Sequence, residues 1–240
     1  MPDPQGPKLR VLVIGATRGT GAEIVPRLLR DGFAVRVLAR DEHAARAKFG
    51  ERVEVVPGDV TRRETLTPAA QGAQHVIFTA GVTKRPASER SIIAVEHDGV
   101  VSALEACKET GMAGRFLYMT AIGVTRHSIS SIALNLIKGN TLVWRRRVEE
   151  RIRSSALDYT IIRCGVLKNA PPDAHAIEVA QRDYPLAPWY RIGRADAAEV
   201  FVQALQRPAT RRTTFDAVWS RSRSRTDWDA LFSRLRPDSA

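Results

Sequence analysis

The chain has 240 residues, of which 44% are hydrophobic and 6% aromatic, and its formal net charge is +11. This length and composition fit one large α/β domain or two small ones, and no apolar run approaches the roughly 20 residues of a membrane-spanning helix. The basic balance is compatible with nucleic-acid binding, but no zinc finger, RNP motif or interleaving of aromatic and basic residues accompanies it. Nucleic acid is therefore not the expected partner, and the charge favours a small anionic ligand instead.

The two cysteines, Cys107 and Cys164, exclude a disulfide framework and a metal-ligand spacing. Residues 1–7 are polar and rich in proline, so we expect a flexible tail and no apolar signal region. A reducing compartment follows from these features, and the expected location is cytoplasmic. Composition leaves the oligomeric state open.

Strand and helix patterns alternate along the chain. RVLVIG (10–15) is a continuous apolar run, typical of a strand buried on both faces, and apolar spacing predicts a helix over 21–32. Further strands are predicted over 34–40, 52–59, 75–81, 115–123, 157–167 and 213–219. Further helices are predicted over 91–111, 143–156, 192–208 and 226–238. The stretch 124–142 has no clear assignment, and SRSRSR (220–225) is expected to be a loop.

This alternation predicts an α/β fold: a doubly wound, mainly parallel sheet with helices on both faces. We expect one domain over 8–240, of Rossmann type, with a small C-terminal part that contributes a substrate pocket.

Three glycines follow the first predicted strand in GATRGTG (15–21). Gly15 comes directly after the strand and Gly21 opens the helix, so the backbone can turn tightly and approach a pyrophosphate closely. The free N–H groups and partial positive charge of the helix N-terminus favour the same ligand. The loop therefore predicts a dinucleotide site, the alternative being an ordinary strand-to-helix turn.

The end of the second strand indicates which dinucleotide is bound. An acidic residue there is typical of NAD enzymes, whereas an arginine accommodates the 2′-phosphate of NADP. This strand ends in Arg40, and Arg18 lies in the glycine loop. Because guanidinium groups bind phosphate in bidentate fashion, the two arginines predict NADP(H) as the cofactor. The alternative is that Arg40 is a solvated charge at a strand end.

Further cofactor contacts are expected where the other strands end. Asp59 is placed to meet the adenine amino group and Val60 to pack on its ring, and Thr79–Gly81 would lie beneath the ribose. The complete predicted set is Gly15, Thr17, Arg18, Gly19, Thr20, Gly21, Arg40, Asp59, Val60, Thr79, Ala80, Gly81, Arg145 and Val166.

With these motifs the chain resembles the atypical short-chain dehydrogenases/reductases of the NAD(P)-binding, NmrA-like family, from about Lys8 to Asp238. The resemblance rests on GATRGTG, PGDVT (57–61), LDYTIIRCG (157–165), GRADAAEVFVQAL (193–205) and, toward small plant and bacterial members, NTLVWRRRVEERI (140–152). It departs at Arg18, where the family loop usually has glycine, and at Cys164, where proline is usual. The resemblance implies NADP binding, with reduction of quinones, flavins or related acceptors in some members and redox sensing without turnover in others.

The resemblance also implies a Tyr-x-x-x-Lys pair, in which lysine lowers the pKa of a proton-donating tyrosine. The lysine position is Arg145 here and the tyrosine position is Thr141. A threonine hydroxyl is too weak an acid and arginine does not deprotonate, so standard carbonyl reduction is not expected. Thr120, at the family's strand-five Ser/Thr position, is the candidate for holding substrate or nicotinamide; the alternative is a structural hydroxyl.

Other chemically active residues are assigned mainly structural roles. Tyr118 is expected to pack in the sheet, Cys107 in the core, and Cys164 to be either a buried residue or a thiol near the nicotinamide. The five histidines form no ligand spacing, and Asp196 suits a helix start.

Three functions remain open from sequence. The first is an NADPH-dependent oxidoreductase, because hydride transfer to a quinone or flavin needs no strong protein acid. The second is a non-catalytic NADP(H) sensor or scaffold, which the missing pair favours. The third is a basic interaction module that retains a cofactor fold.

Overall fold

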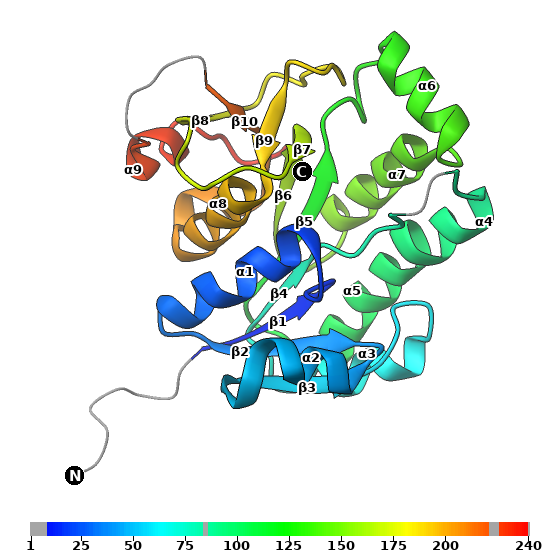
Figure 1. The fold of residues 1–240 in the computed structure, drawn as a ribbon, viewed down its shortest axis with the longest axis vertical. Coiled ribbons are helices and arrows are strands. Elements are labelled where there is room, and N and C mark those ends of the chain that lie inside the picture. Colours follow the sequence, from blue (N-terminus) through cyan, green and yellow to red (C-terminus); the bar gives the residue numbers. More distant parts are fainter. Residues whose placement is uncertain (1–8, 84–85, 221–225, 240) are drawn as a thin grey trace.

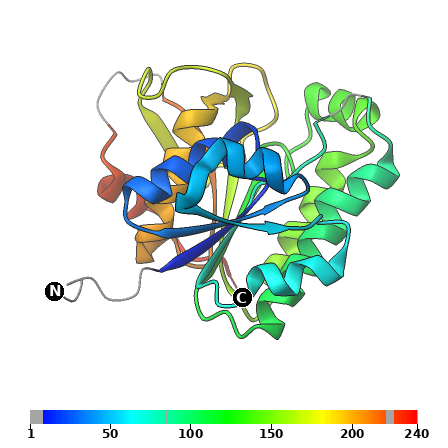
Figure 2. The same cartoon turned by 60° about the horizontal axis from the view of Figure 1, so that its bottom comes forward.

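The computed structural model describes residues 9–83, 86–220 and 226–239. The expected tail over 1–7 and residues 221–225 of the expected loop lie outside the described residues. The described chain forms a three-layer α/β fold, with a central twisted sheet between two layers of helices (Figures 1 and 2).

Across the described ranges the main sheet has eight strands in the order β3–β2–β1–β4–β5–β6–β10–β8. Neighbouring strands run parallel except β8, which pairs antiparallel with β10. The strands are β1 (Arg10–Ile14), β2 (Ala34–Ala39), β3 (Val53–Pro57), β4 (His75–Phe78), β5 (Arg115–Ala121), β6 (Asp158–Cys164), β8 (Ile177–Ala180) and β10 (Thr213–Trp219). The order reverses between β1 and β4, which is where an open α/β sheet binds its ligand. The predicted fold class is confirmed.

The helices cover the two faces of the sheet with their apolar sides. α1 (Gly19–Arg30) packs against α8 (Arg194–Gln206) on one face. α3 (Leu66–Ala70), α5 (Gly99–Glu109) and α7 (Thr141–Arg153) cover the other. The core accordingly has two clusters of buried aliphatic side chains, one on each side of the sheet. Short helices α2 (Glu42–Phe49) and α9 (Trp228–Phe232) pack at the periphery.

Several predicted boundaries are wrong. The strand over 157–167 is two strands, because the chain leaves β6 at Gly165 and continues as β7 (Val166–Lys168), which pairs with β9 (Arg191–Gly193) in a separate small sheet. The helix over 91–111 is α4 (Glu89–Ile92), a π-helical turn (Ile93–Asp98) and α5. The last helix is limited to α9 rather than 226–238.

The unassigned stretch 124–142 contains a further helix, α6 (Ile129–Ile137). Sequence patterns also missed α2, α3, β8 and β9. α2 has Ala45 as its one buried residue, so no apolar periodicity marks it. The two strands are four and three residues long, too short for an alternation to be recognised.

Candidate cofactor site

A cavity of about 760 Å³ opens at the carboxyl ends of the parallel strands, where β1, β2 and β4 end beside the first turn of α1. Its size is in the range typical of cofactor sites. It is lined by Ile14, Gly15, Thr17, Arg18, Gly19, Thr20, Leu38, Ala39, Arg40, Gly58, Asp59, Val60, Thr79, Ala80, Gly81, Val82, Thr83, Val95, Met119, Lys138, Arg145, Leu167, Asn169 and Arg194. The structure therefore brings together twelve of the predicted cofactor residues.

The glycine loop forms one wall of the cavity. Gly15 has φ of +91°, and a Cβ there would lie 2.5 Å from the backbone N of Ala80. A Cβ on Gly21 would lie 2.2 Å from the carbonyl O of Gly15. Gly21 does not line the cavity, since it packs the start of α1 against the loop. The two glycines thus keep the loop tight and its inner surface free of side chains, as a pyrophosphate site requires.

Cations dominate the lining of this cavity. Its charged members are Arg18, Arg40, Lys138, Arg145 and Arg194, against one carboxylate, Asp59. Arg194 was not predicted; its Nη1 donates to Asn169 Oδ1 at 2.7 Å, and its Nε would lie 3.8 Å from a Cβ on Gly19. A cavity with this balance attracts a polyanion.

The two predicted phosphate ligands are exposed at this wall. Arg18 precedes α1 in an extended conformation, and the Arg40 side chain is 68% exposed, its Nε 4.0 Å from Asp59 Oδ2. Asp59 Oδ1 accepts from the N and Oγ1 of Thr61, both at 2.9 Å. Among the described residues, neither guanidinium has a carboxylate closer than 4.0 Å, so both fit an added phosphate.

Hydrogen bonds at two threonines of the predicted set, Thr79 and Thr17, stabilise the loop. Thr79 Oγ1 donates to the carbonyl O of Ile14 at 3.1 Å, which joins the ends of β4 and β1. Lys48 Nζ donates to the carbonyl O of Thr17 at 2.8 Å. These bonds hold the end of the sheet in one shape.

The inner end of the cavity is organised by Glu96, a residue that sequence reasoning missed. Its side chain is 1% exposed and comes from the π-helical turn. The carboxylate accepts from Arg145 Nε at 2.9 Å, Lys138 Nζ at 3.1 Å, Thr141 Oγ1 at 2.5 Å and Val82 N at 2.9 Å. π-helical turns are frequent at functional sites, and here the turn places an acid among the residues that replace the Tyr-Lys pair.

The charges around Glu96 determine its ionisation. Burial by itself would raise the pKa of its carboxyl, but Arg145 and Lys138 outweigh burial and, with the hydrogen bonds, hold the pKa at about 2. Glu96 is therefore a carboxylate at neutral pH and anchors the two cations at the cavity. A sequence signal existed: Glu96 lies four residues after Ile92 and four before Val100, inside an apolar helical stripe.

Some predicted site residues do not line the cavity. Thr120 is 2% exposed, while its neighbour Met119 lines the cavity, because side chains alternate across a strand. Val166 lies outside the lining and its neighbour Leu167 inside it, for the same reason. Burial raises the pKa of the Cys164 thiol to about 12, and it raises the pKa of Tyr118 as well. Both are packing residues, and the structure offers Cys164 no reactive thiolate.

The remaining candidates have structural partners. Asp196 accepts from Trp219 Nε1 at 2.6 Å and Asp173 N at 2.9 Å, and His75 Nδ1 accepts from Arg115 N at 2.9 Å. Cys107 is buried, and burial raises its pKa to about 12. Among the residues with described positions, no group of three His, Cys, Asp or Glu side chains could hold a metal ion.

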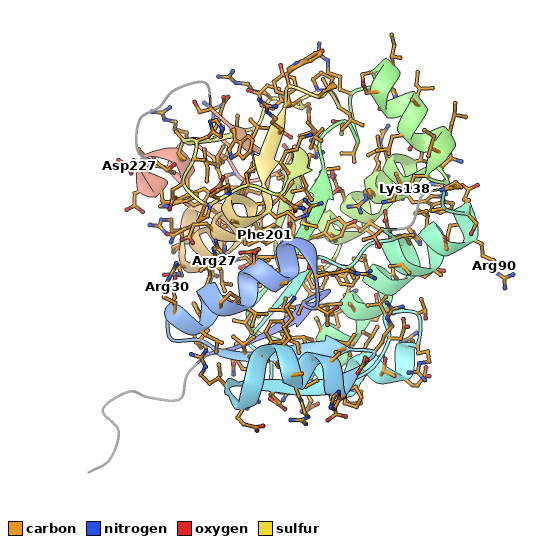
Figure 3. The ribbon with its side chains drawn as sticks, in the orientation of Figure 1. Arg27, Arg30, Arg90, Lys138, Phe201 and Asp227 are labelled. Atoms are coloured by element: carbon orange, nitrogen blue, oxygen red, sulfur yellow. The ribbon has the colours of Figure 1, made fainter. Side chains whose placement is uncertain are left out.

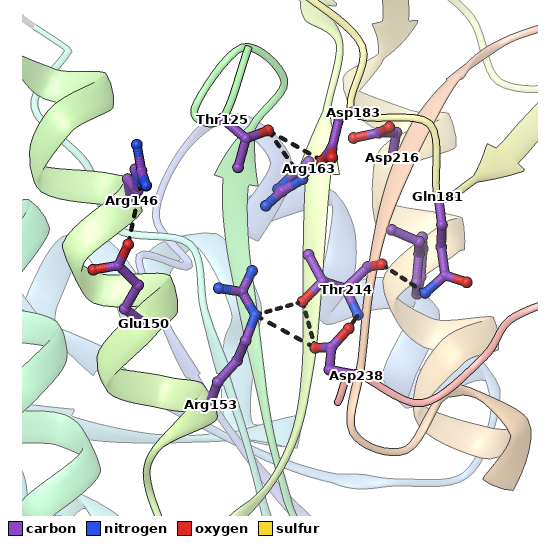
Figure 4. A pocket seen from close by; sticks show the side chains of 11 residues that line it. Thr125, Arg146, Glu150, Arg153, Arg163, Gln181, Asp183, Thr214, Asp216 and Asp238 are labelled. Carbon is purple, nitrogen blue, oxygen red and sulfur yellow. Dashed lines mark hydrogen bonds and ion pairs between the residues drawn. The ribbon is translucent and has the colours of Figure 1, made fainter. Parts of the chain in front are cut away.

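A second cavity, of about 370 Å³, lies between α7 and β10, and its charged groups neutralise one another (Figure 4). Arg163 Nη2 donates to Glu149 Oε2 at 2.7 Å, and Arg153 lies 3.5 Å from Asp238. Burial raises the pKa of Asp216 to about 6, although nearby backbone N–H groups and Arg163 lower it. Its arginines thus have closer carboxylate partners than Arg40, whose Nε is 4.0 Å from Asp59, so this cavity is less suited to phosphate.

The glycine loop, the switch point between β1 and β4 and the cationic cavity define a Rossmann-type dinucleotide-binding protein. A sequence model described as NAD(P)H-binding matches residues 15–208, and the chain belongs to this NAD(P)H-binding family. The predicted NmrA-like, atypical short-chain dehydrogenase/reductase resemblance is confirmed, as is binding of a nicotinamide dinucleotide.

Particular relatives narrow this class to reductase-like proteins. Sanguinarine reductase of Eschscholzia californica is 30% identical, with 95% of this chain and 96% of that protein covered. An uncharacterized chloroplastic protein of Arabidopsis thaliana is also 30% identical, over 95% of this chain and 82% of its own length. The structure of a putative NAD-dependent epimerase/dehydratase from Bacillus halodurans superimposes with a TM-score of 0.79 at 20% identity, covering 95% of this chain and all of that one. At 20% identity, the similarity to the Bacillus halodurans structure supports the fold alone.

The relatives also correct the expected location. Two similar Arabidopsis thaliana proteins are named chloroplastic, so membership of this family and a low cysteine count do not indicate the cytoplasm. The cytoplasmic expectation is withdrawn. No helix in the described ranges has the length and apolar character needed to cross a membrane.

Proposed function

We propose that this protein is an NADPH-dependent reductase that delivers hydride to a quinone, a flavin or a similar acceptor. The observation that carries the proposal is one continuous cationic cavity, with the glycine loop, Arg18 and Arg40 at one end and the Glu96-anchored Lys138 and Arg145 at the other. NADPH, when bound, would supply the hydride. Similarity to a sanguinarine reductase supports reductase chemistry.

In this proposal the chain's own residues bind the cofactor and stabilise charge. Arg18 and Arg40 hold the 2′-phosphate, and Gly15 and Gly21 let the backbone approach the pyrophosphate. Lys138 and Arg145 face the acceptor end with charges fixed by Glu96, so they stabilise negative charge that develops on an acceptor oxygen. The proton comes from solvent or from the Lys138 ammonium, since Thr141 is too weak an acid.

We expect NADPH to bind at least about tenfold more tightly than NADH, because a charge-assisted pair to an extra phosphate is worth about 1.4 kcal/mol or more. Calorimetric titration at fixed salt measures both affinities. Arg18→Ala/Arg40→Ala should abolish the preference, while Arg52→Ala/Arg234→Ala, two exposed arginines outside the cavity lining, removes the same charge and should keep it. Equal affinity for both cofactors in the unmodified protein would refute the assignment of NADP(H).

The experiment that tests the reaction is NADPH oxidation with menadione and FMN as acceptors. We expect turnover with at least one of them, and a raised KM for NADPH in Arg18→Ala/Arg40→Ala. Tight NADPH binding without turnover would instead support the second candidate, a non-catalytic sensor, which the replacement of the Tyr-Lys pair by Thr141 and Arg145 favours.

A further inference from the structure

Helix α6 has its polar side turned inward and its apolar side turned outward. Ile129 and Leu136 are 89% and 81% exposed, and Ile132 and Ile137 are more than half exposed. These side chains recur at the spacing of one helical stripe, which in a globular protein normally faces the core. α6 stands apart from the sheet, above α7 (Figure 1).

The inward side of α6 is held by polar contacts. Ser131 is fully buried, and it forms a reciprocal capping box with Ser128. Asn135 Oδ1 accepts from Leu142 N at 2.9 Å, and Ser128 Oγ donates to the carbonyl O of Leu186 at 2.7 Å. The orientation of the helix is therefore fixed by hydrogen bonds. The outward apolar stripe costs free energy in water unless something covers it.

The charge around α6 indicates what covers it. Residues 126–148 contain no Asp or Glu, and their Lys and Arg residues are Arg126, Lys138, Arg145, Arg146 and Arg147. Glu96 binds Lys138 and Arg145, Glu150 pairs with Arg146, and Glu89 accepts from Asn140 and Trp144. The exposed cations of the segment that have no ion pair among the described residues are Arg126 and Arg147. A second copy is disfavoured, because a two-fold contact would set this basic segment against itself. A convex aliphatic stripe flanked by basic residues fits the interface of an anionic bilayer.

We propose that α6 is an interfacial anchor that binds the surface of an anionic lipid bilayer. The stripe of Ile129, Ile132, Leu136 and Ile137 enters the headgroup region, and the exposed Arg126 and Arg147 contact lipid phosphates. Such a helix lies on the membrane and does not need the length of a spanning segment. Lys138 closes α6 (Figure 3). It also lines the cofactor cavity, so binding would place the cavity beside the lipid surface.

The test is flotation of the full chain with vesicles of phosphatidylcholine mixed with phosphatidylglycerol, and with vesicles of phosphatidylcholine alone, near physiological ionic strength. We expect binding to the anionic vesicles, and a loss of at least about tenfold in the partition coefficient for Ile129→Ser/Leu136→Ser. Leu9→Ser is the matched control: Leu9 is 51% exposed and lies before β1, so this change should leave binding intact.

Circular dichroism and NADPH affinity of the double variant check that it is folded, and they separate this proposal from the proposed reaction. Equal vesicle binding by the unmodified protein and the double variant would overturn the proposal. So would an absence of binding to anionic vesicles. A dimer in solution that Ile129→Ser/Leu136→Ser converts to a monomer would assign the stripe to a second copy instead.

Discussion

Glu96→Gln is expected to lower the free energy of unfolding by about 3–5 kcal/mol, because it leaves the Arg145 and Lys138 charges without their shared carboxylate in a buried place. The Glu96 side chain is 1% exposed, and both cations are 12% exposed. Urea unfolding of the two proteins measures the difference. Glu109→Gln is the control, since Glu109 is 46% exposed and pairs with Arg63 at the surface, where solvent screens the pair, so its loss should lower the free energy of unfolding far less.

The effect of Glu96→Gln should also depend on pH. The pKa of Glu96 is lowered from 4.5 to about 2 in the folded protein, so its stabilisation is fully present above 4.5 and is lost as the pH falls toward 2. The difference between the two proteins should therefore shrink across this range. A difference that is no larger than that of Glu109→Gln, or that does not change with pH, would mean that Glu96 does not hold the two cations.

Gly21→Ala is expected to weaken NADPH binding by more than about a hundredfold and to lower the free energy of unfolding by about 3 kcal/mol. The reason is that the added methyl group would clash with backbone atoms, which cannot move aside as a flexible side chain can. The added Cβ would lie 2.2 Å from Gly15 O and 2.6 Å from Thr79 Oγ1, so α1 and the loop must separate. Calorimetry with NADPH and urea unfolding measure the two effects.

Gly32→Ala separates crowding at the loop from the general cost of replacing a glycine. Gly32 has φ of +84°, but nothing lies within 4 Å of the added Cβ. Gly32→Ala should lower the free energy of unfolding by about 1–2 kcal/mol and leave NADPH affinity unchanged. NADPH affinity in Gly21→Ala equal to that of the unmodified protein would show that the loop does not need its observed shape to bind the cofactor.

The replacement of the Tyr-Lys pair has a structural explanation. Arg145 lies near the buried phenol of Tyr118, but its Nε donates to Glu96, which Thr141 and Lys138 also contact. Position 141 thus holds no tyrosine whose pKa a lysine could lower. The hydrogen-bonded charges of Glu96, Arg145 and Lys138 lie there instead, at the proposed acceptor end of the cavity. This arrangement suits acceptors that need charge stabilisation rather than a strong acid.

Local sequence was sufficient to predict the doubly wound fold, the glycine loop and the class of cofactor. Buried parallel strands are continuous apolar runs, and the loop's constraints lie within seven consecutive residues, so both appear in one stretch of chain. Arg18 and Arg40 could be proposed for the same reason, since Arg18 lies within the glycine loop and Arg40 directly follows the second strand.

Tertiary structure alone decided how distant residues meet. Glu96 reaches Arg145 and Lys138 across more than forty positions, and only the packing of its helix against α7 and the end of α6 brings them together. Burial of a charge likewise depends on partners that a local pattern does not contain. α6 was missed because its apolar stripe is short and its polar contacts come from residues such as Leu186 and Leu142. Which side of a helix faces outward is set by the whole fold.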